Sequence, residues 1–289
     1  MGACAAEEQP DGAAADNVES WSGKDRGDEN FPVGSLLISG ALRPHVHAFY
    51  AFARNADDIA DSGTLAADAK IARLDTMEAV MLGRRQSGSP SALRLRASLA
   101  ATGVAPRHAR DLLVAFRRDA TKQRYTGWDE LYEYCRYSAM PVGRHVLDLH
   151  DEDPATHAPS DALCTSLQVL NHLQDCAKDL AMLDRCYLPL ELLTRHGATI
   201  DDVRGPRQSA GLRAVFDALL DRVDALNAEA ADLPRRTRSR RLRLETAVIV
   251  GLAIRLTRRL RHGDPLATRV KLTKGDAAAS VLAALRYLP

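Results

Sequence analysis

Apolar and polar residues follow a helical pattern along most of this chain, beginning near Gly34 and recurring to the C-terminus. No segment shows the sustained alternation of β-branched and aromatic residues that is typical of a strand. Alanine, leucine and arginine dominate, and all three favour helices. The pattern predicts helices at residues 45–62, 65–85, 91–102, 106–125, 128–148, 159–182, 212–232, 236–262 and 276–288.

Short breaks that contain glycine and proline separate these helices, for example at residues 87–90 and 263–265. The chain has no internal repeat and no linker that would divide its folded part. We therefore expect a single all-α domain over residues 31–289. Residues 1–30 are small, polar and acidic and lack the apolar core of a signal peptide, so we expect them to form a disordered N-terminal tail.

The composition limits the classes of function. Hydrophobic residues make up 46% of the 289 residues, which is enough to bury a sizeable core, and the net charge of +1 gives no overall field that would favour nucleic acid. The five cysteines form no Cys-x-x-Cys pair, which argues against a disulfide framework and against a structural zinc site. No apolar run approaches the roughly 20 residues of a membrane span. A reducing cytoplasm fits this composition best.

The predicted helix at residues 45–62 carries three aspartates at spacings that a structural role does not require. Asp57 and Asp61 are four residues apart and share one helix face, and Asp58 lies three residues before Asp61. Like charges at this spacing repel by roughly a few tenths of a kcal/mol unless a cation lies between them. Taken alone, such a motif is more often a solvated helix face than a metal site.

A second polar stripe lies in the predicted helix at residues 159–182. Asn171, Asp175 and Asp179 recur every four residues within an apolar stretch. Hard oxygen ligands of this kind, completed by water and phosphate oxygens, suit magnesium. Two such stripes facing each other across a bundle core would hold a metal cluster, which could bind a diphosphate and help it leave as an anion. The two stripes together therefore favour a magnesium site over two solvated faces.

Several ordered motifs of the chain resemble those of squalene and phytoene synthases. The segment from Phe49 to Asp61 resembles the first aspartate-rich motif of that family, and residues 167–179 followed by residues 184–189 resemble the second. Residues 134–143 resemble the middle block, and residues 269–274 resemble the closing segment. The similarity extends over about residues 31–288, nearly all of the expected domain.

The resemblance implies an all-α isoprenoid synthase bundle with a central cavity and magnesium at its mouth. The residues that match the family's metal ligands are Asp57, Asp58, Asp61, Asn171, Asp175 and Asp179. Of these, Asp58 is expected to support the direct ligands and not to bind the metal itself. The residues that match its substrate contacts are Phe31, Tyr50, Arg54, Tyr134, Gln168 and Asn171. For Arg54, contact with diphosphate competes with a plain ion pair to a neighbouring aspartate.

Four positions depart from the pattern of the family's condensing members. Residues 138–141 read Ser-Ala-Met-Pro in place of a small-residue stretch, and Arg136 replaces a common tyrosine. Glu29-Asn30 stand where a basic or hydroxyl-bearing phosphate grip is usual, and Gln174 replaces an arginine. Residues 134–144 and 170–176 resemble the branch that makes hydroxysqualene in hopanoid-producing bacteria. That branch acts on presqualene diphosphate and does not condense two farnesyl diphosphates.

The resemblance implies that presqualene diphosphate ionises, that its cation rearranges in an apolar cavity, and that water captures the cation. Arg136 and Tyr137 are the polar residues of the altered middle block that we expect to orient this water. A surface salt bridge is the alternative for Arg136, and simple packing is the alternative for Tyr137. Head-to-head condensation of two prenyl diphosphates is the alternative activity, and a non-catalytic helical partner subunit is a third possibility.

Arginines cluster between Arg235 and Arg243. They suit a solvated helix start, a docking patch for anionic lipid, or a contact with nucleic acid. We favour the first and place lipid second, because the implied substrate and product are highly apolar. Nucleic acid comes last, because no recognition motif or interleaved aromatic residue accompanies the cluster. We thus expect a cytoplasmic enzyme, with contact to the inner face of the membrane as the second choice.

Overall fold

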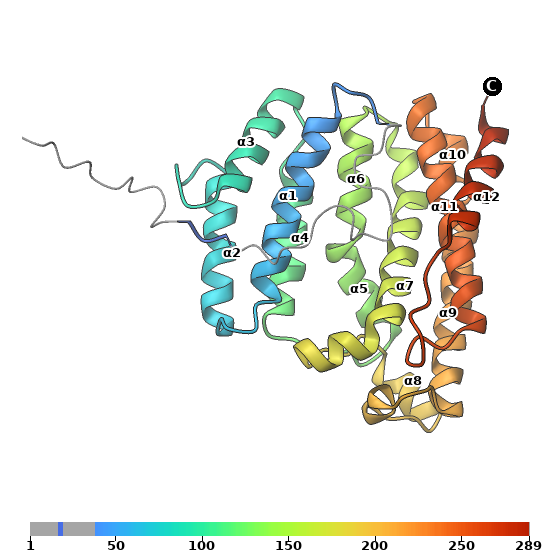
Figure 1. Cartoon of the computed structure of the whole chain (residues 1–289). Helices are drawn as coiled ribbons and strands as arrows, with labels where there is room; N and C mark the ends of the chain where they lie inside the picture. The colour runs from blue at the N-terminus through green and yellow to red at the C-terminus, as the bar shows by residue number, and fades with distance from the viewer. Residues whose placement is uncertain (1–16, 20–37, 289) are drawn as a thin grey trace, which may run out of the picture.

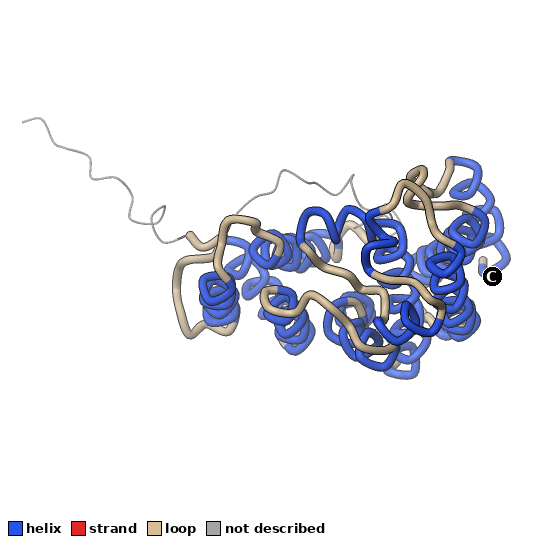
Figure 2. Tube along the Cα trace, turned by 90° about the horizontal axis from the view of Figure 1, so that it is seen from below, coloured by secondary structure: helices blue, strands red, loops and turns tan. Residues whose placement is uncertain are grey.

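The computed structural model describes residues 17–19 and 38–288. Over these ranges the chain is helical and forms no β-strand, with one isolated bridge between Arg124 and Cys186. The helices run side by side from α2 and α3 at one edge of the molecule to α12 at the other (Figure 1). Seen from below, most helices are viewed close to their axes, so they are roughly parallel or antiparallel (Figure 2).

The helices follow the order of the hydrophobic pattern, but twelve are present among the described residues where nine were predicted. The helix predicted at residues 128–148 is two helices, and the short helices at residues 190–195 and 233–236 were not predicted. The bounds of the twelve helices are α1 Arg43–Ala60, α2 Ala67–Met81, α3 Pro90–Thr102, α4 Arg107–Asp119, α5 Trp128–Ser138, α6 Met140–Leu149, α7 His157–Leu183, α8 Leu190–Arg195, α9 Ala210–Ala230, α10 Leu233–Arg236, α11 Arg240–His262 and α12 Lys274–Ala284. Short 3-10 turns lie at Pro154–Thr156 (η1), Ile200–Arg204 (η2) and Leu285–Tyr287 (η3).

The helix predicted at residues 128–148 is two helices, α5 and α6, which meet at Ala139. Proline has no N–H to donate and its ring crowds the carbonyl four residues earlier, so Pro141 can begin α6 but cannot continue α5. Directly after this break, α6 packs closely against α7. A Cβ atom on Gly143 would lie 2.3 Å from the Ser160 hydroxyl oxygen and 2.7 Å from the Cys164 sulfur, so glycine lets α6 approach α7.

The helix predicted at residues 106–125 is also too long, because α4 ends at Asp119. The following segment leaves the helix and pairs with the chain beyond α7, where the Cys186 N–H donates to the Gln123 carbonyl at 2.9 Å. Lys122 and Arg124 carry polar groups that stay near the surface, and Tyr125 is buried. Tertiary pairing across more than sixty residues overrides helix propensity here.

Two hydrophobic cores fill the molecule. One is formed mainly by α1, α2, α3 and α4, with Phe52 and Met77 fully buried in it. The other is formed mainly by α5, α7, α9 and α11, with Leu170 and Phe216 fully buried in it. Two cores that stay apart leave an internal space where α1 faces α7. The architecture therefore confirms the predicted all-α bundle and places a cavity at its centre.

Two residues of the expected N-terminal tail, Val18 and Glu19, contact the domain. The Val18 N–H donates to the Gly88 carbonyl at 2.9 Å. The Glu19 carboxylate accepts from the Ser89 hydroxyl, the Ser91 hydroxyl and the Ser91 N–H at 2.6–2.7 Å. A helix start leaves N–H groups without partners and favours a negative charge, so Glu19 suits the beginning of α3. The rest of the expected tail, and Phe31, lie outside the described residues.

Candidate active site

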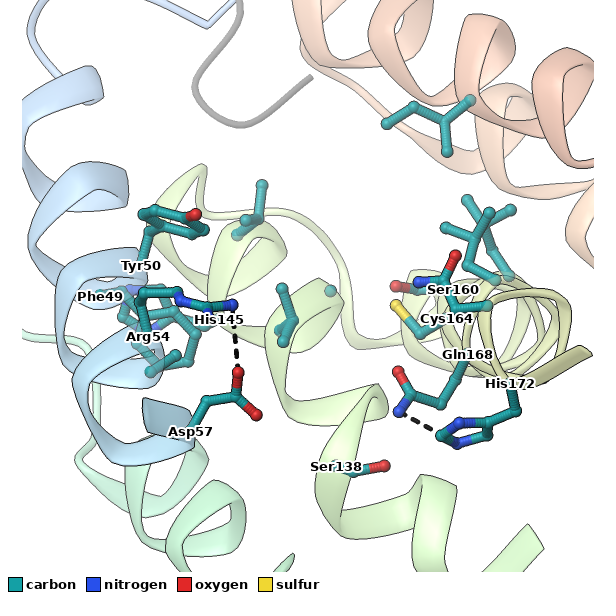
Figure 3. A pocket seen from close by; sticks show the side chains of 18 of the residues that line it. Phe49, Tyr50, Arg54, Asp57, Ser138, His145, Ser160, Cys164, Gln168 and His172 are labelled. Carbon is teal, nitrogen blue, oxygen red and sulfur yellow. Dashed lines mark hydrogen bonds and ion pairs between the residues drawn. The ribbon is translucent and has the colours of Figure 1, made fainter. Parts of the chain in front are cut away.

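A cavity of about 1020 Å³ lies between the two cores. Figure 3 shows α1 side chains on one wall and α7 side chains on the other, with Ser138 between them. One end is polar, because the aspartates of both helices gather there. The remaining wall is mainly apolar and includes Val46, Phe49, Phe116, Val142, Val146, Leu147, Leu163, Leu167, Ile249 and Leu272.

Asp57 of α1 and Asp61, the residue directly after α1, both line the cavity. Removal from bulk water and the nearby Asp61 carboxylate together raise the pKa of Asp57 to about 8, while Arg54 opposes both effects. The Arg54 guanidinium lies 3.1 Å from Asp57 and 2.7 Å from Asp58. Asp58 lies behind the cavity wall and does not line it. Arg54 therefore makes the predicted ion pairs with aspartates and also faces the cavity.

The α7 stripe lines the opposite wall through Asn171, Asp175 and Asp179. Burial, Asp175 on the same helix and Asp61 at the end of α1 together raise the pKa of Asp179 to about 7. An effect of Asp61 on Asp179 requires the two stripes to lie near each other across the cavity. The structure thus brings together the carboxylates that the sequence placed on separate helices.

This donor set fits a magnesium ion. Carboxyl groups whose pKa is raised by burial and by one another become ionised at neutral pH when a cation is bound between them. Among residues 17–19 and 38–288, no three Asp, Glu, His or Cys side chains are grouped closely enough to form a metal site by themselves. Each stripe accordingly offers part of a coordination shell, and water and phosphate oxygens are the natural ligands for the rest.

A buried network lies beneath the aspartates, and its members Arg185, Asp119 and Tyr187 were not predicted as functional. Arg185, only 4% exposed, donates to Asp61 at 2.9 Å and to the Asp119 carbonyl at 2.9 Å. The Asp119 carboxylate accepts from the Tyr134 hydroxyl at 2.8 Å and from the Tyr187 hydroxyl at 3.4 Å. Burial raises the pKa of Asp119 to about 6, while Arg185 opposes that increase. The network fixes the position of Asp61 in the cavity wall.

Arg185 reaches this place because α7 ends abruptly. Asp184, at the end of α7, has a φ of 49°, in the left-handed region that aspartate tolerates better than most residues. The chain therefore turns back under the cavity directly after the helix. The string Asp184-Arg-Cys-Tyr187 within the family-like motif was the available signal, but it carries no helical spacing that would have shown where Arg185 points.

Basic side chains surround the polar end of the cavity. Arg54, Lys178, Arg185, Arg269 and Lys271 all line it. The last two come from the loop before α12, which is tied to α7 by the Gln174 amide donating to the Val270 carbonyl at 2.7 Å. Cations next to a carboxylate-bound metal suit the oxygens of a diphosphate. Gln174 thus holds the basic loop in place, although the sequence showed it only as a replaced arginine.

The predicted substrate contacts Tyr50, Arg54, Tyr134, Gln168 and Asn171 all line the cavity.

The two residues predicted to orient water do not line the cavity. The side chain of Arg136 is 63% exposed and lies 3.7 Å from Glu133, so the surface salt bridge was the correct alternative. Tyr137 packs against the second core, with the Arg118 guanidinium 4.8 Å from its ring centre. Tyr134 and Ser138 lie one turn apart on α5 and both line the cavity, so residues 136 and 137 lie on other faces of this helix.

The profile of the squalene/phytoene synthase family matches residues 24–276. The chain belongs to the squalene/phytoene synthase family. Among curated members of the family, it is 48% identical to the hydroxysqualene synthase of Rhodopseudomonas palustris over 254 residues, which cover 88% of this chain and 87% of that one. It is 43% identical to the hydroxysqualene synthase of Zymomonas mobilis, covering 88% and 86%.

Solved structures agree with this membership of the squalene/phytoene synthase family. The squalene synthase HpnC from Alicyclobacillus acidocaldarius matches with a TM-score of 0.72 at 34% identity, covering 82% of this chain and 90% of that one. A dehydrosqualene synthase in complex with a ligand matches with a TM-score of 0.76 at 21% identity, covering 90% and 92%. The second match concerns the fold alone. Together they support the isoprenoid synthase bundle expected from the resemblance.

Proposed function

We propose that this protein is a hydroxysqualene synthase, which converts presqualene diphosphate and water into hydroxysqualene and diphosphate. The observation that carries the proposal is the identity of 43–48% to three curated hydroxysqualene synthases over 84–87% of their length. The cavity agrees with it. At about 1020 Å³ it lies at the upper end of the roughly 300–1,000 Å³ common for small-molecule sites, as a substrate built from two farnesyl chains requires.

The cavity residues divide the chemistry between its two ends. A magnesium ion held by Asp57, Asp61, Asn171, Asp175 and Asp179 would supply Lewis-acid stabilisation of the departing diphosphate. Lys178, Arg269 and Lys271 bind phosphate oxygens as negative charge develops on them. The apolar wall holds the hydrocarbon chains and limits water around the cation. The aromatic faces of Phe49 and Tyr134 line the same space and stabilise a nearby cation.

Purified protein given magnesium and presqualene diphosphate without reductant should form hydroxysqualene. Given farnesyl diphosphate instead, it should form presqualene diphosphate at a rate at least about tenfold lower. This specificity is expected because the relatives at 43–48% identity are named hydroxysqualene synthases, whereas a phytoene synthase of Paracoccus is 31% identical. A factor of about ten is the order of magnitude for one well-discriminated substrate feature. Product analysis by mass spectrometry measures both rates. Efficient condensation of farnesyl diphosphate would instead assign the chain to the condensing enzymes.

We also propose that the protein docks on anionic membranes through the end of the molecule that carries α12. No helix within the described residues is long and apolar enough to cross a membrane. The C-terminal end of the molecule nevertheless has an exposed apolar surface. Its residues each have an exposed fraction of 48–68%: Val281, Leu282, Leu285 and Leu288. Exposed arginines lie on α10, in the turn after it and at the start of α11, at positions 235, 236, 238, 240 and 241. The short helix η3 packs against α11.

Apolar and basic groups side by side are the features that bind a headgroup region. Leu233 and Leu242, from the same part of α10 and α11, also line the cavity. The cavity therefore extends towards the end of the molecule that would contact the membrane. An apolar product would have a short route from the cavity into lipid.

Vesicle sedimentation tests the membrane contact. The wild-type protein should sediment with vesicles of phosphatidylglycerol and phosphatidylcholine, and less in high salt because screening weakens the arginine contacts. Leu282→Glu with Leu285→Glu should weaken sedimentation by about tenfold, since buried apolar area is lost and like charge is added. Met182→Glu, a change at an exposed apolar residue on α7, is the control and should sediment normally. Equal sedimentation of all three proteins would exclude this surface.

A further inference from the structure

Capture of a cation by water needs a polar group in an apolar cavity, and neither Arg136 nor Tyr137 lines that cavity. The α7 wall offers another candidate. Gln168 and His172 are four residues apart on one helix face, and both line the cavity. The Gln168 amide nitrogen lies 3.2 Å from the Nε2 atom of His172, and Figure 3 shows this bond at the cavity wall.

The imidazole of His172 is held firmly. Its ring stacks on Tyr187 with centres 3.5 Å apart and planes 16° from parallel, and the residue is only 8% exposed. Tyr187 in turn bonds to Asp119 and accepts from Arg185. His172 is thereby attached to the same buried network that fixes Asp61.

The bond between Gln168 and His172 orients the glutamine amide. An amide NH2 group can only donate, so the Nε2 atom of His172 must accept in this bond. With its NH2 group turned to His172, Gln168 directs its carbonyl oxygen away from that ring. Figure 3 shows this oxygen on the cavity side of α7, where it can accept a hydrogen bond from a molecule in the cavity.

Gln168 also lies at a suitable depth. Seven residues separate it from Asp175, which corresponds to about 10 Å along a helix. A diphosphate bound at the aspartates would direct its reacting carbon and the adjoining cyclopropane away from them into the cavity, along the wall on which Gln168 lies. The carbonyl oxygen of Gln168 therefore lies beside the region where the cation forms.

Several other polar groups of the cavity are less suitable. The Ser138 hydroxyl oxygen and both ring nitrogens of His145 are fully buried and make no hydrogen bond in the described structure, so they are not presented to a water in the cavity. The aspartates are anionic when they hold a metal, and a carboxylate beside a carbocation can itself form a bond to carbon. A neutral amide orients water without competing for the cation.

We propose that Gln168 holds the water molecule that captures the cation, and that His172 is a positioning residue that orients the Gln168 amide. This inference rests on the proposed function. The C–O bond of presqualene diphosphate breaks and its electron pair leaves with diphosphate. Water donates one hydrogen bond to the Gln168 carbonyl and uses a lone pair to form the new C–O bond. The proton that the water loses passes to the released diphosphate, and Gln168 remains neutral throughout.

The experiment uses the full chain with magnesium and presqualene diphosphate in oxygen-18-labelled water. Wild-type protein should place the label in hydroxysqualene. Gln168→Leu keeps a similar shape without the carbonyl and should lower the hydroxysqualene share of all products by about fivefold, the factor that corresponds to one lost hydrogen bond. Products of proton loss and misplaced alcohols should rise in its place. Consumption of presqualene diphosphate should change by less than about twofold, because ionisation precedes capture.

His172→Phe keeps an aromatic ring for stacking on Tyr187 and removes the acceptor nitrogen, so it should change the product share in the same direction. Arg136→Leu is the control and should leave both the share and the rate unchanged, since this side chain is exposed outside the cavity. Melting curves must show that the variants are folded. A separate change, His172→Gln, restores an acceptor and should recover part of the hydroxysqualene share.

Two failures would be distinguishable. If folded Gln168→Leu and His172→Phe keep the wild-type product share while the wild-type protein makes labelled hydroxysqualene, this inference is wrong and the proposed function stands. If the wild-type protein forms no hydroxysqualene from presqualene diphosphate, the proposed function is wrong and the inference falls with it. If Gln168→Leu consumes presqualene diphosphate more slowly than the wild type but keeps the wild-type hydroxysqualene share, Gln168 is a substrate contact only. That result would also overturn the inference.

Discussion

Replacing Asp57 or Asp179 by asparagine should lower turnover of presqualene diphosphate by about 100- to 1,000-fold, the range seen when one group that stabilises developing charge is removed. Both carboxylates line the cavity, one on each wall. Each variant keeps the shape of the side chain and removes its charge. Circular dichroism should show unchanged helicity, because neither residue belongs to the hydrophobic cores.

Magnesium should raise the melting temperature of the wild-type protein, and by more at pH 8 than at pH 6. Burial raises the pKa of Asp57 to about 8 and that of Asp179 to about 7. Between roughly pH 4 and pH 8 the metal-free folded state thus binds more protons than the unfolded chain, so its stability falls as the pH rises. A bound cation compensates the ionised pair and offsets this loss.

Asp58→Asn is the matched control for the aspartate variants. Asp58 belongs to the same motif but pairs with Arg54 at 2.7 Å behind the cavity wall. We expect a loss of about tenfold, the lower end of the range for groups that support a ligand. Equal losses in all three variants would mean that the aspartates of the two motifs act as one structural unit. A melting temperature of Asp179→Asn that still rises with magnesium as in the wild type would count against the ligand role.

Arg185→Met should destabilise the protein by about 3–5 kcal/mol, the usual cost of removing one partner from a buried ion pair. The change leaves Asp119, which is 4% exposed, without its guanidinium neighbour. It also removes the 2.9 Å bond to Asp61, so turnover should fall together with stability. Urea denaturation followed by circular dichroism measures the free energy of unfolding.

Two further variants separate charge from packing at this site. Asp119→Asn in the Arg185→Met background should recover part of the lost stability, since the unpaired buried charge is gone. Arg204→Met is the control, because that arginine is 52% exposed and its ion pairs at 3.5–3.9 Å contribute about 0–1 kcal/mol. If Arg185→Met is as stable as Arg204→Met, the buried network does not support the fold.

The sequence by itself determined the helical class, the order of the principal helices and the two carboxylate stripes. Each of these depends on residues a few positions apart. Asp57 and Asp61 share a face wherever their helix lies, and so do Asn171, Asp175 and Asp179. The similarity to squalene and phytoene synthases added the expectation that the two stripes meet across a cavity. The structure confirms that arrangement, because both stripes line one cavity.

Only the tertiary structure decided which neighbours of these stripes belong to the site. Arg136 and Tyr137 were predicted from the altered middle block, but Tyr134 and Ser138 are the residues of α5 that line the cavity, so residues 136 and 137 lie on other faces of that helix. Arg185 lies in a turn after α7, where no helical spacing predicts the direction of a side chain. Its partners come from the residue that follows α1, Asp61, and from the last residue of α4, Asp119. Contacts between elements far apart in the chain depend on packing, and local spacing does not encode them.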